Sequence, residues 1–119
     1  MQKIYRLTGN IPSKKNSRII TRSGLSIPSK AYMDWHDQAV EEVKLQGLVK
    51  FKKPVLIQGD FYFGDNVRRD LDNRIQSILD MFTDVGIIQD DRWQCVPEIR
   101  ITGQLDRRNP HTIIKIEEL

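Results

Sequence analysis

The chain contains a single cysteine, Cys95, and only two histidines among its 119 residues. An internal disulfide is therefore impossible, and a structural zinc site, which needs several Cys or His ligands, is disfavoured. No run of about 18 apolar residues occurs, so we expect no transmembrane helix. The opening residues, MQKIYRLTGN, lack the apolar core of a signal peptide. These absences predict a cytoplasmic protein with no membrane partner.

Acidic residues are also absent from the first part of the chain, where none precedes Asp34. Residues 1–55 contain 11 Lys and Arg against 4 Asp and Glu, a balance of +7. Residues 56–119 contain 8 against 12, a balance of −4, in agreement with the net charge of +3. A basic arm beside an acidic region suits a polyanionic substrate that binds together with a metal ion. A solvated basic loop would explain the same charge pattern.

The length fits one domain, residues 1–119, of the α+β class. Residues 11–28 are rich in Ser, Lys, Arg, Gly and Pro, and they predict a long basic loop without regular structure. The expected order is β-loop-α-β-α-β-β, a mixed four-stranded sheet with two helices on one side or a dimer interface on the other. The strands should cover Lys3–Thr8, Val55–Phe63, Trp93–Thr102 and Thr112–Glu117, the last two as a hairpin.

Two amphipathic patterns predict the helices. Ser29 is a suitable N-cap for the first helix, and its core-facing stripe consists of Tyr32, Trp35, Ala39 and Val43. The second helix should begin at Asp70 and end at Gly86, which we expect in a left-handed conformation. Its buried stripe should consist of Leu71, Ile75, Ile78, Leu79 and Phe82.

Carboxylates bracket this second helix in the segment RRDLDNRIQSILDMFTDVGIIQDD. Helix capping alone would account for Asp70 and Asp72, but not for the second pair, Asp90 and Asp91. The helix advances about 18 Å from Asp72 to Asp84, and an extended return to Asp91 can cover about 23 Å. Asp91 can thus lie beside Asp72 if the return is nearly straight. A site of carboxylate oxygens would favour Mg²⁺ or Mn²⁺ over zinc.

The string RDLDN at residues 69–73, the helix after it, Gly86 and the pair Asp90–Asp91 together resemble the RusA family of Holliday junction resolvases. Less specifically, Pro12–Ser13 with Asn16 is similar to a loop of that family. The resemblance implies a RusA-like fold and a homodimeric, Mg²⁺-dependent endonuclease that cuts four-way DNA junctions, with Mn²⁺ as a substitute.

The resemblance also implies roles for single residues. It assigns Asp70, Asp72 and Asp91 as catalytic metal ligands and Arg69 as a cation that holds a phosphate oxygen. We interpret Asp90 as a loop cap or solvated charge rather than a ligand. The family pattern has a lysine where this chain has Gln76. Either Lys14 or Lys15 would compensate for the missing charge, or the enzyme would be slower or altered in its choice of substrate.

Backbone contacts to DNA are expected from the basic residues, although each could equally be a solvated charge. The candidates are Lys14, Lys15, Asn16, Arg18, Arg22, Arg68, Arg69, Arg107 and Arg108. The main hypothesis is a junction-resolving nuclease of DNA recombination and repair. Two alternatives stay open, a junction-binding protein of the same fold without cleavage activity and a metal-dependent phosphohydrolase of small nucleotides.

Overall fold

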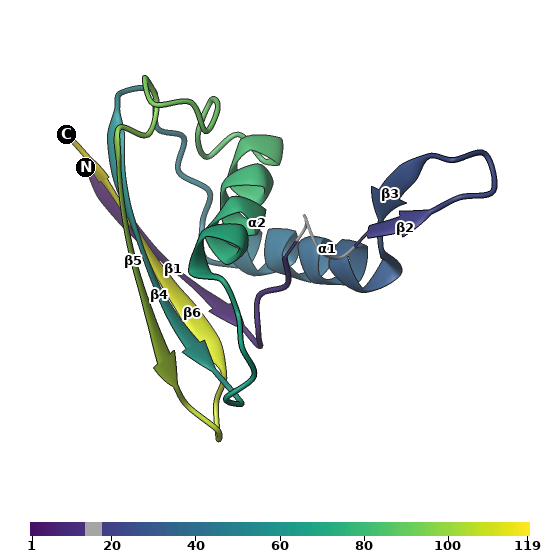
Figure 1. The fold of residues 1–119 in the computed structure, drawn as a ribbon. Helices are drawn as coiled ribbons and strands as arrows, with labels where there is room; N and C mark the ends of the chain where they lie inside the picture. Colours follow the sequence, from purple (N-terminus) through teal and green to yellow (C-terminus); the bar gives the residue numbers. More distant parts are fainter. Residues whose placement is uncertain (14–17) are drawn as a thin grey trace.

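A mixed four-stranded sheet forms the centre of the fold, and two helices lie on one of its faces (Figure 1). The computed structural model describes residues 1–13 and 18–119. The α+β class and the order of the main elements are as predicted, with one small hairpin in addition. In chain order the elements are β1 (Gln2–Thr8), β2 (Arg18–Ile20), β3 (Ser26–Pro28), α1 (Lys30–Leu45), β4 (Val55–Phe63), α2 (Leu71–Asp84), β5 (Glu98–Leu105) and β6 (His111–Glu118).

The strand order in the sheet is β1-β6-β4-β5, and this corrects one prediction. The last two strands were expected to form a hairpin, but β6 pairs antiparallel with β1 and β4, while β5 pairs parallel with β4. Helix α2 carries the chain back along the sheet between β4 and β5, which makes those two strands parallel. Strand β6 then takes a central place, where Ile114 and Ile116 are fully buried between neighbours on both sides.

The core lies between the sheet and the two helices. Tyr5, Ile57 and Phe61 are fully buried on the helix-facing side of the sheet. The predicted stripe of α2 is confirmed, since Ile75, Ile78, Leu79 and Phe82 are buried and Leu71 is partly buried. Gly59 lets α2 approach β4 closely, because a Cβ there would lie 3.1 Å from Cδ1 of Ile75.

Helix α1 begins and packs as predicted. The hydroxyl of Ser29 accepts a hydrogen bond from the amide of Tyr32 at 3.2 Å, which satisfies one of the free amides at the helix start. The helix also covers the outer edge of β1. Glu42 accepts a hydrogen bond from the amide of Thr8 at 2.9 Å, and Gln46 accepts one from the amide of Arg6 at 2.7 Å. The part of this edge at Arg6 and Thr8 is therefore unavailable for pairing with another strand.

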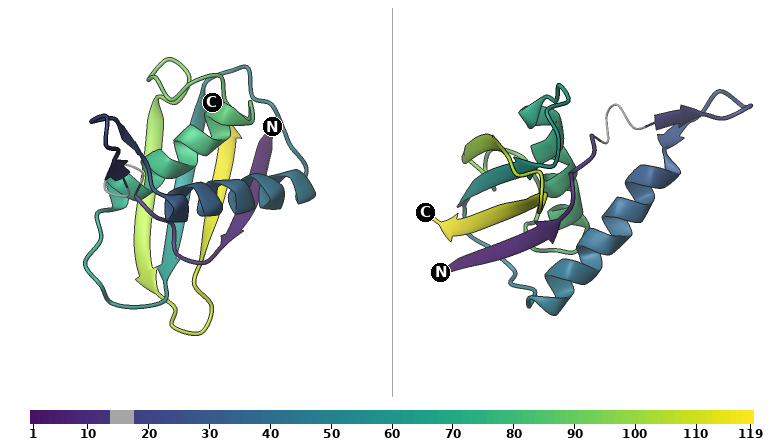
Figure 2. Two further views of the ribbon diagram at one scale, coloured as in Figure 1. Left: turned by 90° about the vertical axis from the view of Figure 1, so that its right-hand side faces the viewer. Right: turned by 90° about the horizontal axis from the view of Figure 1, so that it is seen from below.

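Residues 18–28 do not belong to a structureless loop of the kind that we expected for residues 11–28. Strands β2 and β3 form an antiparallel hairpin in which Ile19 lies opposite Ile27. Gly24, at φ +86°, is in the turn between them. The hairpin projects away from the rest of the molecule (Figure 2), and Ile20 at its end is 78% exposed. No helix in the described part of the chain is long and apolar enough to cross a membrane.

Candidate functional site

Asp70 and Asp72 lie at the N-terminal end of α2. Asp70 is the N-cap, but its side chain makes no capping hydrogen bond within the described residues. Its nearest polar partner is the amide nitrogen of the Asn73 side chain, at 3.5 Å. Asp72 accepts a hydrogen bond from the backbone amide of Asn73 and is exposed. Capping therefore does not use the carboxylate of Asp70, and both carboxylates face solvent where a cation could bind.

Gly86 ends α2 in the predicted left-handed conformation, with φ +79°. The amide of Ile87 donates to the carbonyl of Phe82 at 2.9 Å, and the amide of Gly86 donates to the carbonyl of Thr83 at 3.1 Å. These are the two hydrogen bonds of a Schellman motif, and the buried side chains of Ile87 and Phe82 supply its apolar element. The chain consequently folds back over the helix end, and its return is not the nearly straight one that we expected.

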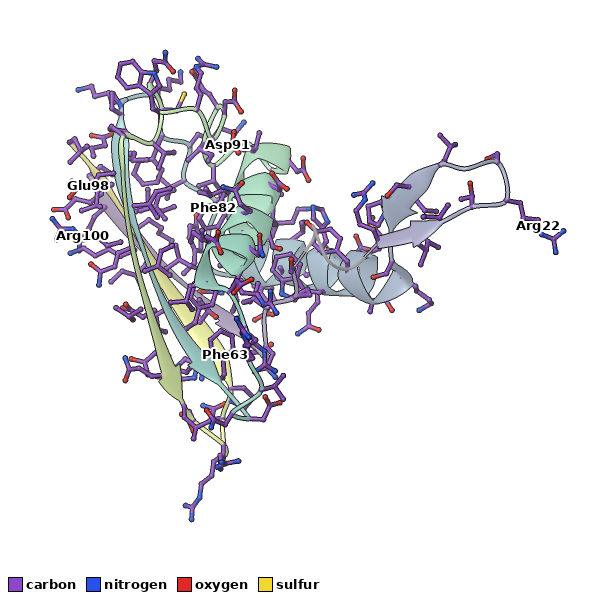
Figure 3. The ribbon with its side chains drawn as sticks, viewed as in Figure 1. Arg22, Phe63, Phe82, Asp91, Glu98 and Arg100 are labelled. Atoms are coloured by element: carbon purple, nitrogen blue, oxygen red, sulfur yellow. The ribbon has the colours of Figure 1, made fainter. Side chains whose placement is uncertain are left out.

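The turned return places Asp91 close enough to Asp80 on α2 for their charges to interact. Figure 3 shows the position of Asp91. Asp80 lies eight residues beyond Asp72, about 12 Å along a helix that rises 1.5 Å per residue. Within residues 1–13 and 18–119, no three Asp, Glu, His or Cys side chains are grouped closely enough to hold a metal ion. The site of Asp70, Asp72 and Asp91 thus stays a prediction, one that requires a movement of these carboxylates toward one another.

The pKa values of the neighbouring residues Asp90 and Asp91 are shifted in opposite directions. Partial burial raises the pKa of Asp91, and the neighbouring carboxylates of Asp90 and Asp80 raise it further. The pKa of Asp90 is lowered, mainly because its carboxylate accepts the backbone amide of Asp91 at 2.8 Å. Asp90 also pairs with Arg92 at 3.3 Å. Asp90 thus caps its own loop, whereas Asp91 carries a charge that a nearby cation would stabilise.

Arg69 is held in place by the loop that precedes α2. Its Nη1 lies 2.7 Å from Oδ1 of Asp65, and its guanidinium lies 4.9 Å from the centre of the Phe63 ring. Only 13% of the side chain is exposed. The hydrogen bond from Arg69 lowers the pKa of Asp65, so this ion pair persists in mildly acidic solution. Arg69 is therefore a fixed cation one residue before Asp70.

The remaining basic candidates lie in two regions. Arg68 is exposed beside Arg69, and Arg107 in the β5–β6 turn is close enough to Asp65 to lower its pKa. Arg18 bonds to Ser26 across the hairpin, while Arg22 extends from the hairpin end (Figure 3). Arg108 is exposed. Lys14, Lys15 and Asn16 lie outside the described residues.

The exposed face of α2 carries Asp72, Gln76 and Asp80, which follow one another at intervals of four residues. Gln76 is exposed and carries no charge, so the position of the expected lysine is neutral.

Sequence reasoning did not single out Arg74, which is the only Lys or Arg in α2. Its Nε and Nη1 are buried and have no hydrogen-bond partner in the described structure. Desolvation lowers the pKa of Arg74, the nearby charge of Arg69 lowers it further, and Asp70 acts in the opposite direction. Burial of this kind leaves no mark in the sequence, although the four-residue interval from Asp70 to Arg74 could have suggested a shared helix face.

Comparison with known protein families matches the chain to a family described as endodeoxyribonuclease RusA. The match covers residues 9–117 and therefore includes both helices, the hairpin and all the candidate carboxylates. No curated protein matches the chain.

Proposed function

The chain belongs to the RusA family of endodeoxyribonucleases, whose members act on Holliday junctions, and we propose that it resolves such junctions by Mg²⁺-dependent hydrolysis. The family membership, over residues 9–117, is the observation that carries the proposal. Physiologically, this activity would serve DNA recombination and repair.

The proposed metal ligands fit a hard cation in their chemistry. Asp70, Asp72 and Asp91 offer only carboxylate oxygens, the donors that Mg²⁺ and Mn²⁺ prefer. The carboxylate of Asp70 makes no capping hydrogen bond within the described residues, and Asp91 has a raised pKa that a cation would lower. When bound, the metal ion would supply Lewis-acid stabilisation of the phosphate and a lowered pKa for a coordinated water. The carboxylate of Asp80, which lies near Asp91, adds negative charge beside that proposed ligand.

The protein's own cations would position the DNA. Arg69 is fixed by Asp65 and Phe63 one residue before Asp70, so it can hold a phosphate oxygen with little further loss of side-chain entropy. Arg68 and Arg107 extend the basic surface from this point. On the other side, Arg22 at the end of the projecting hairpin would contact a more distant part of the backbone. Lys14 and Lys15 would join this contact.

A four-way junction has two strands of like polarity to cut, so a homodimer with two-fold symmetry would supply two equivalent sites. Junction shape and flexibility would provide most of the specificity, and base contacts would be secondary.

The test is a cleavage assay on a synthetic four-way junction with and without Mg²⁺, with linear duplex of the same sequence as control. We expect paired nicks in the junction that require the metal ion, and little cleavage of the duplex. Junction and duplex cut at equal rates would refute structure selectivity. Cleavage in the presence of a chelator would refute the metal dependence.

The neutral side chain of Gln76 supports a second candidate function, a junction-binding protein that does not cleave. A lysine at this exposed place on α2 could stabilise the charge that develops on the phosphate, and glutamine cannot. The same assay separates the two functions, because tight binding without any nicked product would favour the second. The third possibility, a nucleotide phosphohydrolase, would show hydrolysis of free nucleotides and indifference to branched DNA.

A further inference from the structure

The guanidinium of Arg74 lacks the partners that a buried arginine normally has. Its Nε and Nη1 are shielded from solvent, and no described residue accepts a hydrogen bond from them. Buried donors without acceptors are costly, and a charged group makes the cost larger. An arginine that served the fold would be paired with a carboxylate or with backbone carbonyls. Because no described residue meets these donors of Arg74, they indicate an acceptor that arrives with a ligand.

Arg74 lies on α2 one turn after Asp70 and one turn before Ser77, which contacts the chain at Pro12. It follows Asp70 by four residues, and the charges of Asp70 and Arg69 both act on it. One turn further along α2, the hydroxyl of Ser77 donates to the carbonyl of Pro12 at 2.7 Å, which fixes the chain just before Lys14 and Lys15. A ligand at Arg74 would thus lie beside Asp70 and close to the point where the basic segment leaves the core.

The chemistry of the place points to an anion with several acceptor oxygens. The charge of Arg69 acts unfavourably on Arg74, and the opposing effect of Asp70 is the smallest of the three influences on Arg74, so a bound anion would stabilise both guanidinium groups. A phosphate accepts hydrogen bonds from a guanidinium in a planar, bidentate manner. Arg74 is partly exposed as a residue and no hydrogen bond within the described residues restrains it, so rotation about its side-chain bonds can bring the donors to such an oxygen.

We propose that Arg74 binds a backbone phosphate of the DNA beside Asp70, and that it is the cation which α2 supplies to the substrate in the absence of charge at Gln76. This proposal rests on the nuclease function proposed above and adds a phosphate-binding residue to it. The substrate phosphate would provide the hydrogen-bond acceptors that the described residues do not supply to Arg74.

The test measures junction binding at several salt concentrations with Ca²⁺ in place of Mg²⁺, so that binding is read without cleavage. The variants are Arg74→Gln and Arg74→Lys. The control is Arg100→Gln, which removes the same charge from an exposed arginine paired with Glu98 on β5, away from α2 (Figure 3). We expect Arg74→Gln to weaken binding about tenfold and to reduce the slope of log K against log salt by about 0.9, the value for one phosphate contact. Arg74→Lys should bind with a slope close to that of the wild type, and Arg100→Gln should have the wild-type slope.

Thermal unfolding separates this role from a structural one. Because Arg74 donates no hydrogen bond to the described residues, Arg74→Gln should not lower the Tm. A lower Tm together with an unchanged salt slope would overturn the proposal. The test of Arg74 does not depend on the proposed cleavage activity. If the wild-type protein binds junctions but never nicks them, the proposed nuclease activity is refuted, and the salt dependence of binding still tests the role of Arg74. A wild-type protein that nicks, with an unchanged slope for Arg74→Gln, refutes only the role of Arg74. No junction binding by the wild type would refute both.

Discussion

Gly86 connects the stability of the fold to the position of Asp91, and its replacement by alanine gives a quantitative test. Gly86 has φ +79° and ends α2. A Cβ in this left-handed region costs about 1–2 kcal/mol. The nearest atom to that Cβ within the described residues would be Cε of Lys50 at 3.8 Å, an ordinary contact. The penalty of Gly86→Ala therefore arises from the backbone conformation alone.

Thermal unfolding followed by circular dichroism measures this penalty. For a domain of this size, 1 kcal/mol corresponds to about 3–6 °C in Tm, so Gly86→Ala should unfold at least about 3 °C below the wild type. Gly86→Asn should lose less, because asparagine tolerates the left-handed region. A control is Gly24→Ala, with φ +86° but in the β2–β3 hairpin, where no described atom lies within 4 Å of the added Cβ. The backbone strain of Gly24→Ala is confined to the hairpin, so the Tm of the main unfolding transition should not change.

The same substitution should reduce junction cleavage more than junction binding. The two hydrogen bonds of the Schellman motif bury Ile87 and thereby direct the chain that carries Asp91 back toward α2. Cleavage should be measured well below the Tm, so that loss of folded protein does not contribute. Equal Tm values for wild type, Gly86→Ala and Gly86→Asn would refute the reasoning, since they would show that the left-handed conformation does not fix the helix end.

The other predictions concern the carboxylates and the neutral position on α2. Asp72→Asn should abolish cleavage and leave junction affinity within about twofold in a gel-shift assay; retained cleavage would mean that the metal site is misplaced. Gln76→Lys should raise the cleavage rate if a missing charge limits it, and an unchanged rate would show that another cation already fills the role. Because the folded-state pKa of Asp91 is raised, its charge destabilises the fold above that pKa and the effect disappears as the pH falls below the normal value of about 4. Asp91→Asn should therefore raise the Tm at pH 7 but not below about pH 4, and Mg²⁺ should raise the Tm of the wild type more than that of Asp91→Asn.

The elements that local patterns define were predicted well from the sequence. The stripe of Ile75, Ile78, Leu79 and Phe82 was sufficient to place α2, and Ser29 marked the start of α1 correctly. Gly86 was recognised as the end of α2. Its consequence was missed, because a Schellman motif turns the following residues back onto the helix, whereas the expected return was straight.

The partners of the strands could not be predicted in the same way. Strand pairing joins residues that are distant in the chain, and the alternating pattern of β6 is equally compatible with an edge or a central place. The hairpin of β2 and β3 left a weak signal, the Ser23–Gly24 turn between two isoleucine-containing stretches, but most of its apolar side chains are exposed and gave no burial pattern. The burial of the Arg74 donors, which no described residue meets, depends on packing around α2 and could not be predicted from the sequence.

The covered edge of β1 limits how copies of this chain can assemble. Glu42 and Gln46 accept hydrogen bonds from the amides of Thr8 and Arg6 on that edge, whereas no described residue is hydrogen-bonded to the outer side of β5. Addition of a strand is therefore favoured at β5 and hindered at β1. Two copies that met along β5 would form an eight-stranded sheet with α1 against each of its outer edges. Helix α1 thus hinders further growth of such a sheet into fibres, in addition to its part in the core.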